Sequence, residues 1–320
     1  QYIQVFKDKK IVNNKKNLGK LSIISETFQR CYLEDPRTDV HFSNLINDNE
    51  TDFSRYTYFY LTYLVEQNRL ADANEIIDDI EFIDTSLLLS QGKSWIENKN
   101  QQKLSRIFSC KNHNDLLSEF LFLISNLYSS EDNFQKSNYY LNLSNFLNPK
   151  FVFNLSLVAE NQFENNELEK AKKTLRNFKK EDNFYYWYRL KKEAQIIAKQ
   201  TNKKDALDYI TFEFKKIKEP NNKLLFDIGN FYRNSKKYEE AISYYSKVID
   251  NGNLDLDTKS DLLYRRGGSY ERMNNYEKSD EDLIQALELK PDDAYILNYL
   301  AYSWLERDYK INEAMDMLKT

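Results

Sequence analysis

Small residues recur in pairs through most of this sequence. The first members of the pairs are Ser125, Ala159, Ala194, Gly229, Gly267 and Ala301. The second members are Ser137, Ala171, Ala206, Ala241, Ser279 and Ala314. Successive first members lie 34, 35, 35, 38 and 34 residues apart, a period typical of stacked helical repeats. Within a pair the spacing is 12 or 13 residues. This offset is expected where two short antiparallel helices cross and only small side chains let them approach.

The composition agrees with helices joined by short polar turns. The 320 residues include only 6 Gly and 4 Pro, which argues against an all-β fold rich in turns. Hydrophobic residues make up 41% and charged residues 30%, so we expect a soluble chain that can bury a core. A net charge of −4 and a pI near 5.6 do not indicate the broad basic surface that nucleic acid binding requires.

The two ends of the chain carry separate signals. The first twenty residues are basic, which is typical of a solvated terminus, and a basic arm for an anionic surface is the alternative. No apolar run is long enough for a membrane span, and the start has no signal-peptide core. Because the chain stops inside an expected second helix, we expect a piece of a longer protein.

Cys31 and Cys110 could pair, although two separate thiols are the simpler expectation.

The last third of the sequence resembles tetratricopeptide repeats. The residues that carry the resemblance in one unit are Ile228, Gly229, Tyr232, Tyr238, Ala241 and Tyr245. Those of the next unit are Gly267, Tyr270, Tyr276, Leu283, Ala286 and Pro291. The following unit has Leu300, Ala301, Trp304, Ala314 and Leu318, with one extra residue in its turn. Over 118–221 fewer positions match the family pattern, and before residue 118 fewer still. The repeats are similar to those of bacterial repeat proteins.

The phase of the repeats divides the chain into three regions. Residues 1–53 form a divergent, partly helical segment, and residues 54–117 form degenerate hairpins of the same type. Residues 118–320 form the repeat array, with units that start near 118, 152, 187, 222, 260 and 294. The resemblance implies an all-α solenoid of antiparallel hairpins wound into a right-handed superhelix, whose inner wall is lined by the first helix of every unit.

The resemblance also implies that exposed positions of the first helices contact a partner. Mapped by phase, these positions hold Asn126, Glu160, Lys191, Gln195, Asn230, Arg233, Arg265, Arg272, Tyr295, Asn298 and Tyr302. Asn and Arg side chains there can hydrogen-bond a peptide backbone or carboxylates without demanding one sequence. The competing interpretation of any single residue is an ordinary solvated side chain.

One specialised site of the family is not expected. Some members grip the C-terminal carboxylate of chaperones with Lys, Asn and Arg side chains from three units. Asn230 keeps one of these positions. Phe226 and Arg265 replace a Lys and an Asn, and Tyr295 and Tyr299 replace the last Lys and Arg. The clamp is therefore broken.

Signatures of catalysis are absent from the sequence. The two histidines, His41 and His113, have no metal-ligand spacing with Cys or Asp, and GxxxxGK[ST], GxSxG and HExxH do not occur. We therefore expect no enzyme activity, no cofactor and no metal.

The sequence favours a scaffold that binds a protein or peptide in its concave groove, in the cytoplasm or the cell envelope of a bacterium. One alternative is the regulatory or substrate-recruiting arm of an enzyme whose catalytic domain lies outside residues 1–320. A less favoured alternative is an RNA-binding helical repeat. The identity of the partner is not encoded in any motif.

Overall fold

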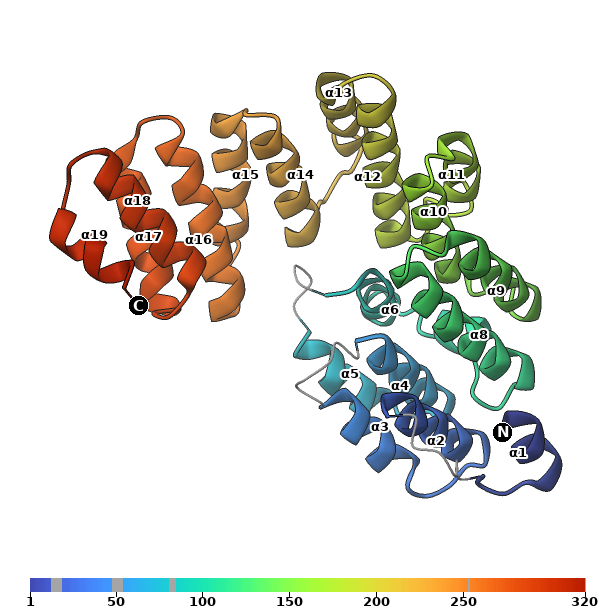
Figure 1. Ribbon diagram of the computed structural model, residues 1–320. Helices are drawn as coiled ribbons and strands as arrows, with labels where there is room; N and C mark the ends of the chain where they lie inside the picture. The colour runs from blue at the N-terminus through green and yellow to red at the C-terminus, as the bar shows by residue number, and fades with distance from the viewer. Residues whose placement is uncertain (13–18, 48–53, 81–84, 253, 320) are drawn as a thin grey trace. The chain divides into compact units, whose positions relative to one another are not determined.

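The computed structural model covers all 320 residues and describes residues 1–12, 19–47, 54–80, 85–252 and 254–319. Within these ranges the regular structure is helical, with nineteen α-helices and one 3₁₀ turn (Figure 1). The all-α helical-repeat solenoid expected from the period is confirmed. Two compact units can be distinguished, one from residues 1–80 and 85–193 and the other from residue 194 onward.

The first unit is built from helical hairpins with one additional helix at the start. Its helices are α1 (Tyr2–Asp8), α2 (Lys20–Tyr32), α3 (Thr38–Ile46), α4 (Ser54–Glu66), α5 (Leu70–Asp78), α6 (Leu87–Glu97), α7 (Gln102–Ile107), α8 (His113–Ser130), α9 (Phe134–Leu147), η1 (Val152–Asn154), α10 (Leu155–Glu164) and α11 (Leu168–Leu175). Helix α12 (Asn183–Gln200) crosses the boundary at residue 193. Residues 20–46, which the repeat phase leaves unassigned, also form two packed helices, α2 and α3.

The second unit continues with hairpins of the same kind. Its helices are α13 (Lys203–Phe214), α14 (Asn222–Asn234), α15 (Tyr238–Asp250), α16 (Leu256–Glu271), α17 (Tyr276–Leu289), α18 (Ala294–Glu306) and α19 (Ile311–Met317). Helices α14 and α15 pack together, as do α16 with α17 and α18 with α19. The second helix of each hairpin also packs on the first helix of the next, so the hairpins share one continuous core.

The paired small residues lie where the two helices of a hairpin cross. Ser125 and Ser137 are fully buried, and their hydroxyl groups are 3.0 Å apart. At position 229 a Cβ atom would lie only 2.9 Å from Cε1 of the buried Tyr245 ring, so glycine is needed for this approach. The alanines of the pattern are buried as well. The predicted reason for the small residues is confirmed.

A single turn geometry joins most of the hairpins. Two or three residues after the end of the first helix, a residue other than glycine adopts a left-handed conformation, with φ of 56° at Asp132, 60° at Lys236 and 59° at Asn274. The next N–H returns to a carbonyl near the helix end, as from Asn133 to Tyr128 at 2.9 Å, which ends the helix. The same conformation occurs early in the chain at Glu34, Asn68 and Lys99.

The core of the first unit encloses a charged pair among aromatic rings. The Arg55 guanidinium lies 3.8 Å from the centroid of the Phe122 ring, and three further phenylalanine rings surround it at 5.2 to 5.4 Å. It binds Glu119 with two hydrogen bonds, of 2.8 and 2.5 Å, and Asn154 with one of 3.0 Å. Removal of one partner would leave the other charge buried and unpaired.

Cys31 and Cys110 form a disulfide, so the expectation of two separate thiols is wrong. The Cα atoms of the two residues are 5.8 Å apart, and both side chains are buried. The bond joins α2 to the segment before α8, across 79 residues of sequence. The sequence could not show this pairing, because it depends on the stacking of hairpins that carry no clear repeat pattern.

Candidate partner-binding surface

The first helices of three hairpins in the second unit are joined by side-chain contacts. Nη1 of Arg265 on α16 lies 3.4 Å from Oδ1 of Asn230 on α14. On the other side of α16, the rings of Tyr264 and Tyr299 pack edge to face with centroids 5.6 Å apart. We call this surface of α14, α16 and α18 the first-helix face. It includes Asn230, Arg233, Tyr264, Arg265, Arg272, Tyr295, Asn298 and Tyr302.

The side chain of Asn230 is oriented by a neighbour from the second helix of its own hairpin. The Tyr245 hydroxyl donates to Oδ1 of Asn230 at 2.8 Å, and burial raises the pKa of Tyr245 to about 12, so the hydroxyl keeps its proton near neutral pH. Arg265 donates to the same oxygen. With Oδ1 engaged twice, the Nδ2 group is left as the donor that Asn230 can present to a ligand.

Arg265 is held in one position by three neighbours. Its Nε donates to Oδ2 of Asp261 at 2.8 Å, one turn earlier on α16. Its guanidinium carbon lies 5.1 Å from the centroid of the Phe226 ring on α14. Together with the bond to Asn230, these contacts fix a guanidinium group that still has N–H donors to spare.

A hollow of about 480 Å³ lies beside Arg265, between the starts of α16 and α18. Its lining includes Tyr264, Tyr295 and Ile296 together with charged residues. The charges are largely paired within the wall, because Lys290 lies 3.1 Å from Asp257 and Asp261 binds Arg265. Asp293 accepts the N–H groups of Tyr295 and Ile296 at the start of α18. The hollow therefore offers aromatic surface and polar groups with little net charge.

The other predicted residues of this unit lie on or directly after the same three helices. Tyr295 and Tyr302 on α18 are 80% and 59% exposed. Asn298 lies one turn from each of them and is exposed. Arg272 is 3.4 Å from Glu271, whereas Arg233 has no ion-pair partner among the described residues.

The predicted residues outside α14, α16 and α18 lie on α8, α10 and α12. Asn126 is exposed on α8, and Gln195 is exposed on α12, where Lys191 is half-buried. Glu160 accepts hydrogen bonds from Tyr188 at 2.8 Å and Lys192 at 2.6 Å, so its carboxylate is already occupied.

Sequence reasoning missed three residues that shape the first-helix face. Asp261, Tyr264 and Lys290 line the hollow, but the repeat phase does not predict them as contacts. Asp261 could have been found from its position, because it precedes Arg265 by four residues on one helix and so faces it. Lys290 follows the second helix of its hairpin, and no periodic pattern brings it to α16.

The described residues include no group of three or more His, Cys, Asp or Glu side chains arranged to hold a metal ion. None of the helices in the described ranges combines the length and the apolar character that a membrane crossing requires.

Comparison with known protein families identifies the repeats. The family description "Tetratricopeptide repeat" matches residues 223–251 and 260–293, which cover α14 to α17. Residues 223–251 and 260–293 are therefore similar to tetratricopeptide repeats. A search of curated proteins finds no match to the sequence.

Solved structures of several repeat proteins are similar to the chain. In the Cut9–Hcn1 hetero-tetramer of the APC/C, one chain is 15% identical with a TM-score of 0.47, over 94% of this chain and 60% of that one. YrrB, described as a tetratricopeptide-repeat protein with an unusual peptide-binding site, is 18% identical with a TM-score of 0.36, over 65% and 96%. A signal-transduction ATPase with a tetratricopeptide repeat sensor from Pyrococcus horikoshii is 16% identical with a TM-score of 0.48, over 96% and 46%.

These similarities carry no information about a shared partner, and the chain spans only part of the Cut9–Hcn1 and Pyrococcus chains. Tetratricopeptide repeats serve in general as scaffolds for protein–protein interaction. At this level the predicted function is confirmed, whereas the groove and its residues stay predictions.

Proposed function

We propose that the first-helix face binds an extended peptide segment of a partner protein. The observation that carries the proposal is the pair of hydrogen bonds that hold Oδ1 of Asn230 and leave its Nδ2 group to donate. A donor fixed in this way binds the carbonyl groups of an extended backbone without reading the sequence. Its orientation is set before the partner arrives, which lowers the cost of ordering on binding.

The charges and aromatic rings beside Asn230 supply the rest of the binding surface. Arg233 has no ion-pair partner among the described residues and suits a carboxylate of the peptide. The hollow beside Arg265 is lined by Tyr264 and Tyr295 and suits an apolar or aromatic side chain. The peptide we expect is therefore extended, with an acidic residue and an apolar residue on the side that faces the repeats.

The two alternatives from the sequence receive less support from these contacts. Arg265 and Arg272 lie beside Asp261 and Glu271, which weakens the positive field that a nucleic acid backbone requires. An enzyme arm would use the same peptide-binding face, so it differs only in what lies outside residues 1–320.

The proposal is tested by selecting random 16-residue peptides on the immobilised protein by display, then measuring their affinity for variants. Peptides of the expected class lose about tenfold in affinity with Asn230→Ala and with Arg233→Ala. The matched control is Asn177→Ala, an exposed asparagine of the first unit, which leaves binding unchanged. If every selected peptide binds the Asn230 and Arg233 variants as tightly as the unmodified protein, the proposal is wrong.

A further inference from the structure

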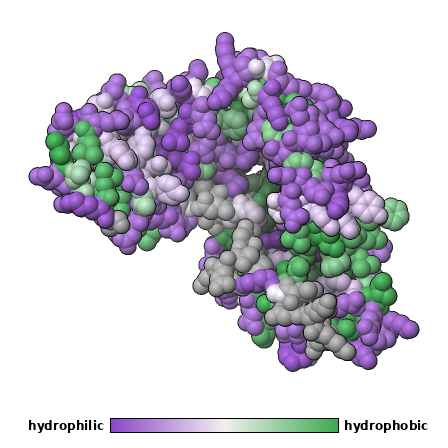
Figure 2. Space-filling view, in the orientation of Figure 1, coloured by the Kyte–Doolittle hydropathy of each residue, from purple (hydrophilic) through white to green (hydrophobic). Residues whose placement is uncertain are grey.

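Helix α9 carries the two most exposed aromatic side chains among the described residues of the first unit. Phe146 is 81% exposed and Tyr139 is 62% exposed. They are seven residues apart, so they lie on one side of the helix, two turns or about 10 Å from each other. Leu143 is exposed between them. In Figure 2 hydrophobic side chains gather over α8 and α9.

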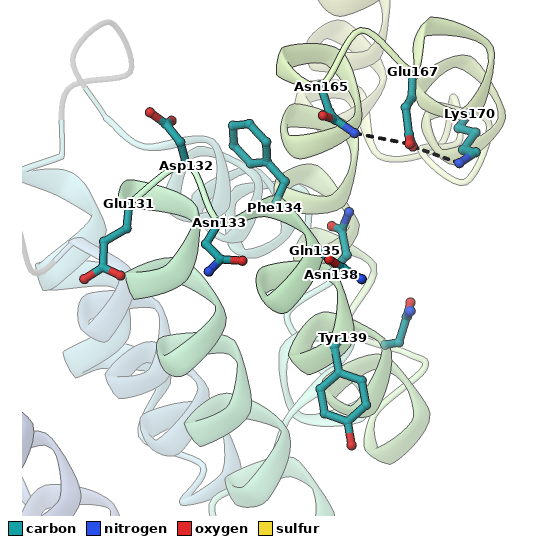
Figure 3. A pocket seen from close by; sticks show the side chains of 11 residues that line it. Glu131, Asp132, Asn133, Phe134, Gln135, Asn138, Tyr139, Asn165, Glu167 and Lys170 are labelled. Atoms are coloured by element: carbon teal, nitrogen blue, oxygen red, sulfur yellow. Dashed lines mark hydrogen bonds and ion pairs between the residues drawn. The ribbon is translucent and has the colours of Figure 1, made fainter.

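A hollow of about 870 Å³ continues this apolar side toward the start of α9. It lies between α9 and the turn that connects α10 to α11, and Tyr139 lines it (Figure 3). The opposite wall contains Asn165, Glu167 and Lys170. Exposed apolar residues are common as single side chains, but here one member of an exposed aromatic pair, Tyr139, also lines a recess.

The charge of the hollow is negative at one end. Glu167 is neutralised by Lys170 at 3.0 Å and also accepts the Asn165 amide at 3.2 Å. Glu131 and Asp132 sit in the turn before α9, and neither has an ion-pair partner among the described residues. Because these two carboxylates are unpaired, they favour a ligand that places a positively charged group at this end of the hollow.

An amide in the wall is oriented in the same manner as Asn230. Oδ1 of Asn138 accepts from Nδ2 of Asn161 at 3.0 Å, so Nδ2 of Asn138 is the group left to donate. The hollow thus combines a fixed donor, an apolar side and a negative end, all on elements of the first unit.

We propose that these residues form a second binding surface, for an amphipathic helix of a partner protein. We call it the α9 surface and define it by Glu131, Asp132, Asn138, Tyr139 and Phe146. Apolar side chains of the partner cover Tyr139 and Phe146, whose separation of two helical turns matches anchors at positions i and i+7 of a helix. A Lys or Arg near one end of that helix pairs with Glu131 and Asp132.

The α9 surface is independent of the first-helix face. Helices α9 and α11 are the second helices of their hairpins, whereas the first-helix face is built from α14, α16 and α18. All residues of the α9 surface belong to the first unit, and those of the first-helix face belong to the second. A single protein can therefore bind two ligands of different chemistry.

The same display selection tests this surface with its own variants. Peptides that bind it carry apolar residues at helical spacing and a net positive charge. They lose tenfold or more in affinity with the double variant Tyr139→Ser and Phe146→Ser, and about fivefold with Glu131→Gln and Asp132→Asn together. The loss from the charge variants shrinks as salt is raised from about 50 to about 300 mM, because the carboxylates are exposed.

Matched controls separate this surface from general stickiness and from the first-helix face. Phe212 on α13 is 62% exposed, as Tyr139 is, so Phe212→Ser leaves this class of peptide unaffected. Asn230→Ala also leaves it unaffected. Folding of each variant is checked by circular dichroism and thermal unfolding.

Three results would overturn the proposal. The first is that no selected peptide depends on Tyr139 and Phe146. The second is that the dependent peptides carry a net negative charge. The third is that sedimentation shows the protein to self-associate through these residues, because the occupant would then be a second copy of the chain.

Discussion

The hydroxyl group of Tyr245 donates a hydrogen bond to Oδ1 of Asn230 at 2.8 Å, across the two helices of one hairpin. The Tyr245 ring fills the space left by Gly229, so one side chain closes the hairpin and orients the neighbouring asparagine. Tyr245 therefore connects Gly229, which permits the close helix crossing, with Asn230, which we propose to bind the peptide.

This link predicts the effect of Tyr245→Phe. The ring stays in place while the donor to Asn230 is lost, so we expect peptide affinity to fall about three- to tenfold and stability to fall by about 1 kcal/mol. Isothermal titration calorimetry and urea unfolding measure the two effects. Tyr238→Phe, whose hydroxyl has no hydrogen bond among the described contacts, is the control and leaves both unchanged. Unaltered affinity in Tyr245→Phe would remove the orienting role.

Gly229→Ala tests the close approach of the two helices. The new Cβ would lie 2.9 Å from a ring carbon of Tyr245, which is fully buried, so the ring or the helices must shift. Overpacking of this kind costs about 1–3 kcal/mol, more than the roughly 1 kcal/mol that alanine gains over glycine in a helix. Gly268→Ala is the milder comparison, because its nearest neighbour is the hydroxyl of Tyr299 at 3.3 Å. Chemical unfolding should rank Gly229→Ala as the less stable variant.

Reduction of the bond between Cys31 and Cys110 should destabilise the first unit. The bond closes a loop with a sequence separation of 79 residues, so its removal costs about 2–4 kcal/mol. Thermal unfolding with and without reducing agent measures the loss, and Cys110→Ser should show it without reductant. The intact mass of the unreduced protein checks the bond itself. Two thiols that react with a thiol reagent in the native, unreduced protein would contradict it.

Asp115 predicts a pH dependence of stability in the first unit. Burial raises the pKa of its carboxyl to about 6, although the Ser109 N–H bond at 2.9 Å opposes the shift. In the unfolded chain the pKa is lower, near 3.9. The folded state therefore binds the proton more tightly, and this contribution to stability is full below the unfolded pKa and lost as pH rises through about 6.

The variant Asp115→Asn isolates this contribution. Relative to the variant, wild-type stability should increase as pH falls from about 7 to about 4.5. Urea unfolding of both proteins across this range provides the measurement. A difference between them that does not change with pH would show that Asp115 titrates alike in the folded and unfolded states.

The sequence predicts those parts of the fold that depend on residues recurring in every repeat unit. The small residues at 229 and 241 place a helix crossing directly, because only small side chains fit there. The turn is harder to recognise, since Lys236 adopts the left-handed conformation that glycine usually supplies. For the same reason the early hairpins around Asn68 and Lys99 carry only a weak sequence signal although their turns have the same geometry.

The interior of the first unit was not predictable from the period. The ion pair of Arg55 and Glu119 joins residues 64 positions apart, and no repeat spacing relates them. In the candidate site, the phase of the repeat is enough to predict that Asn230 and Arg265 lie on first helices. Their partners Tyr245 and Asp261 follow only from the packing of particular side chains.

The enclosure of Arg55 bears on the order in which the chain folds. Its hydrogen bonds to Glu119 and Asn154 span 64 and 99 residues, and Gln91 binds the Phe184 N–H across 93. On the first-helix face of the second unit, the bond between Asn230 and Arg265 spans only 35. Contacts between distant residues slow folding because a long loop must close before they form. During synthesis the first unit therefore cannot complete its core until residue 184 has emerged, whereas each later hairpin can add to its predecessor as soon as it is made.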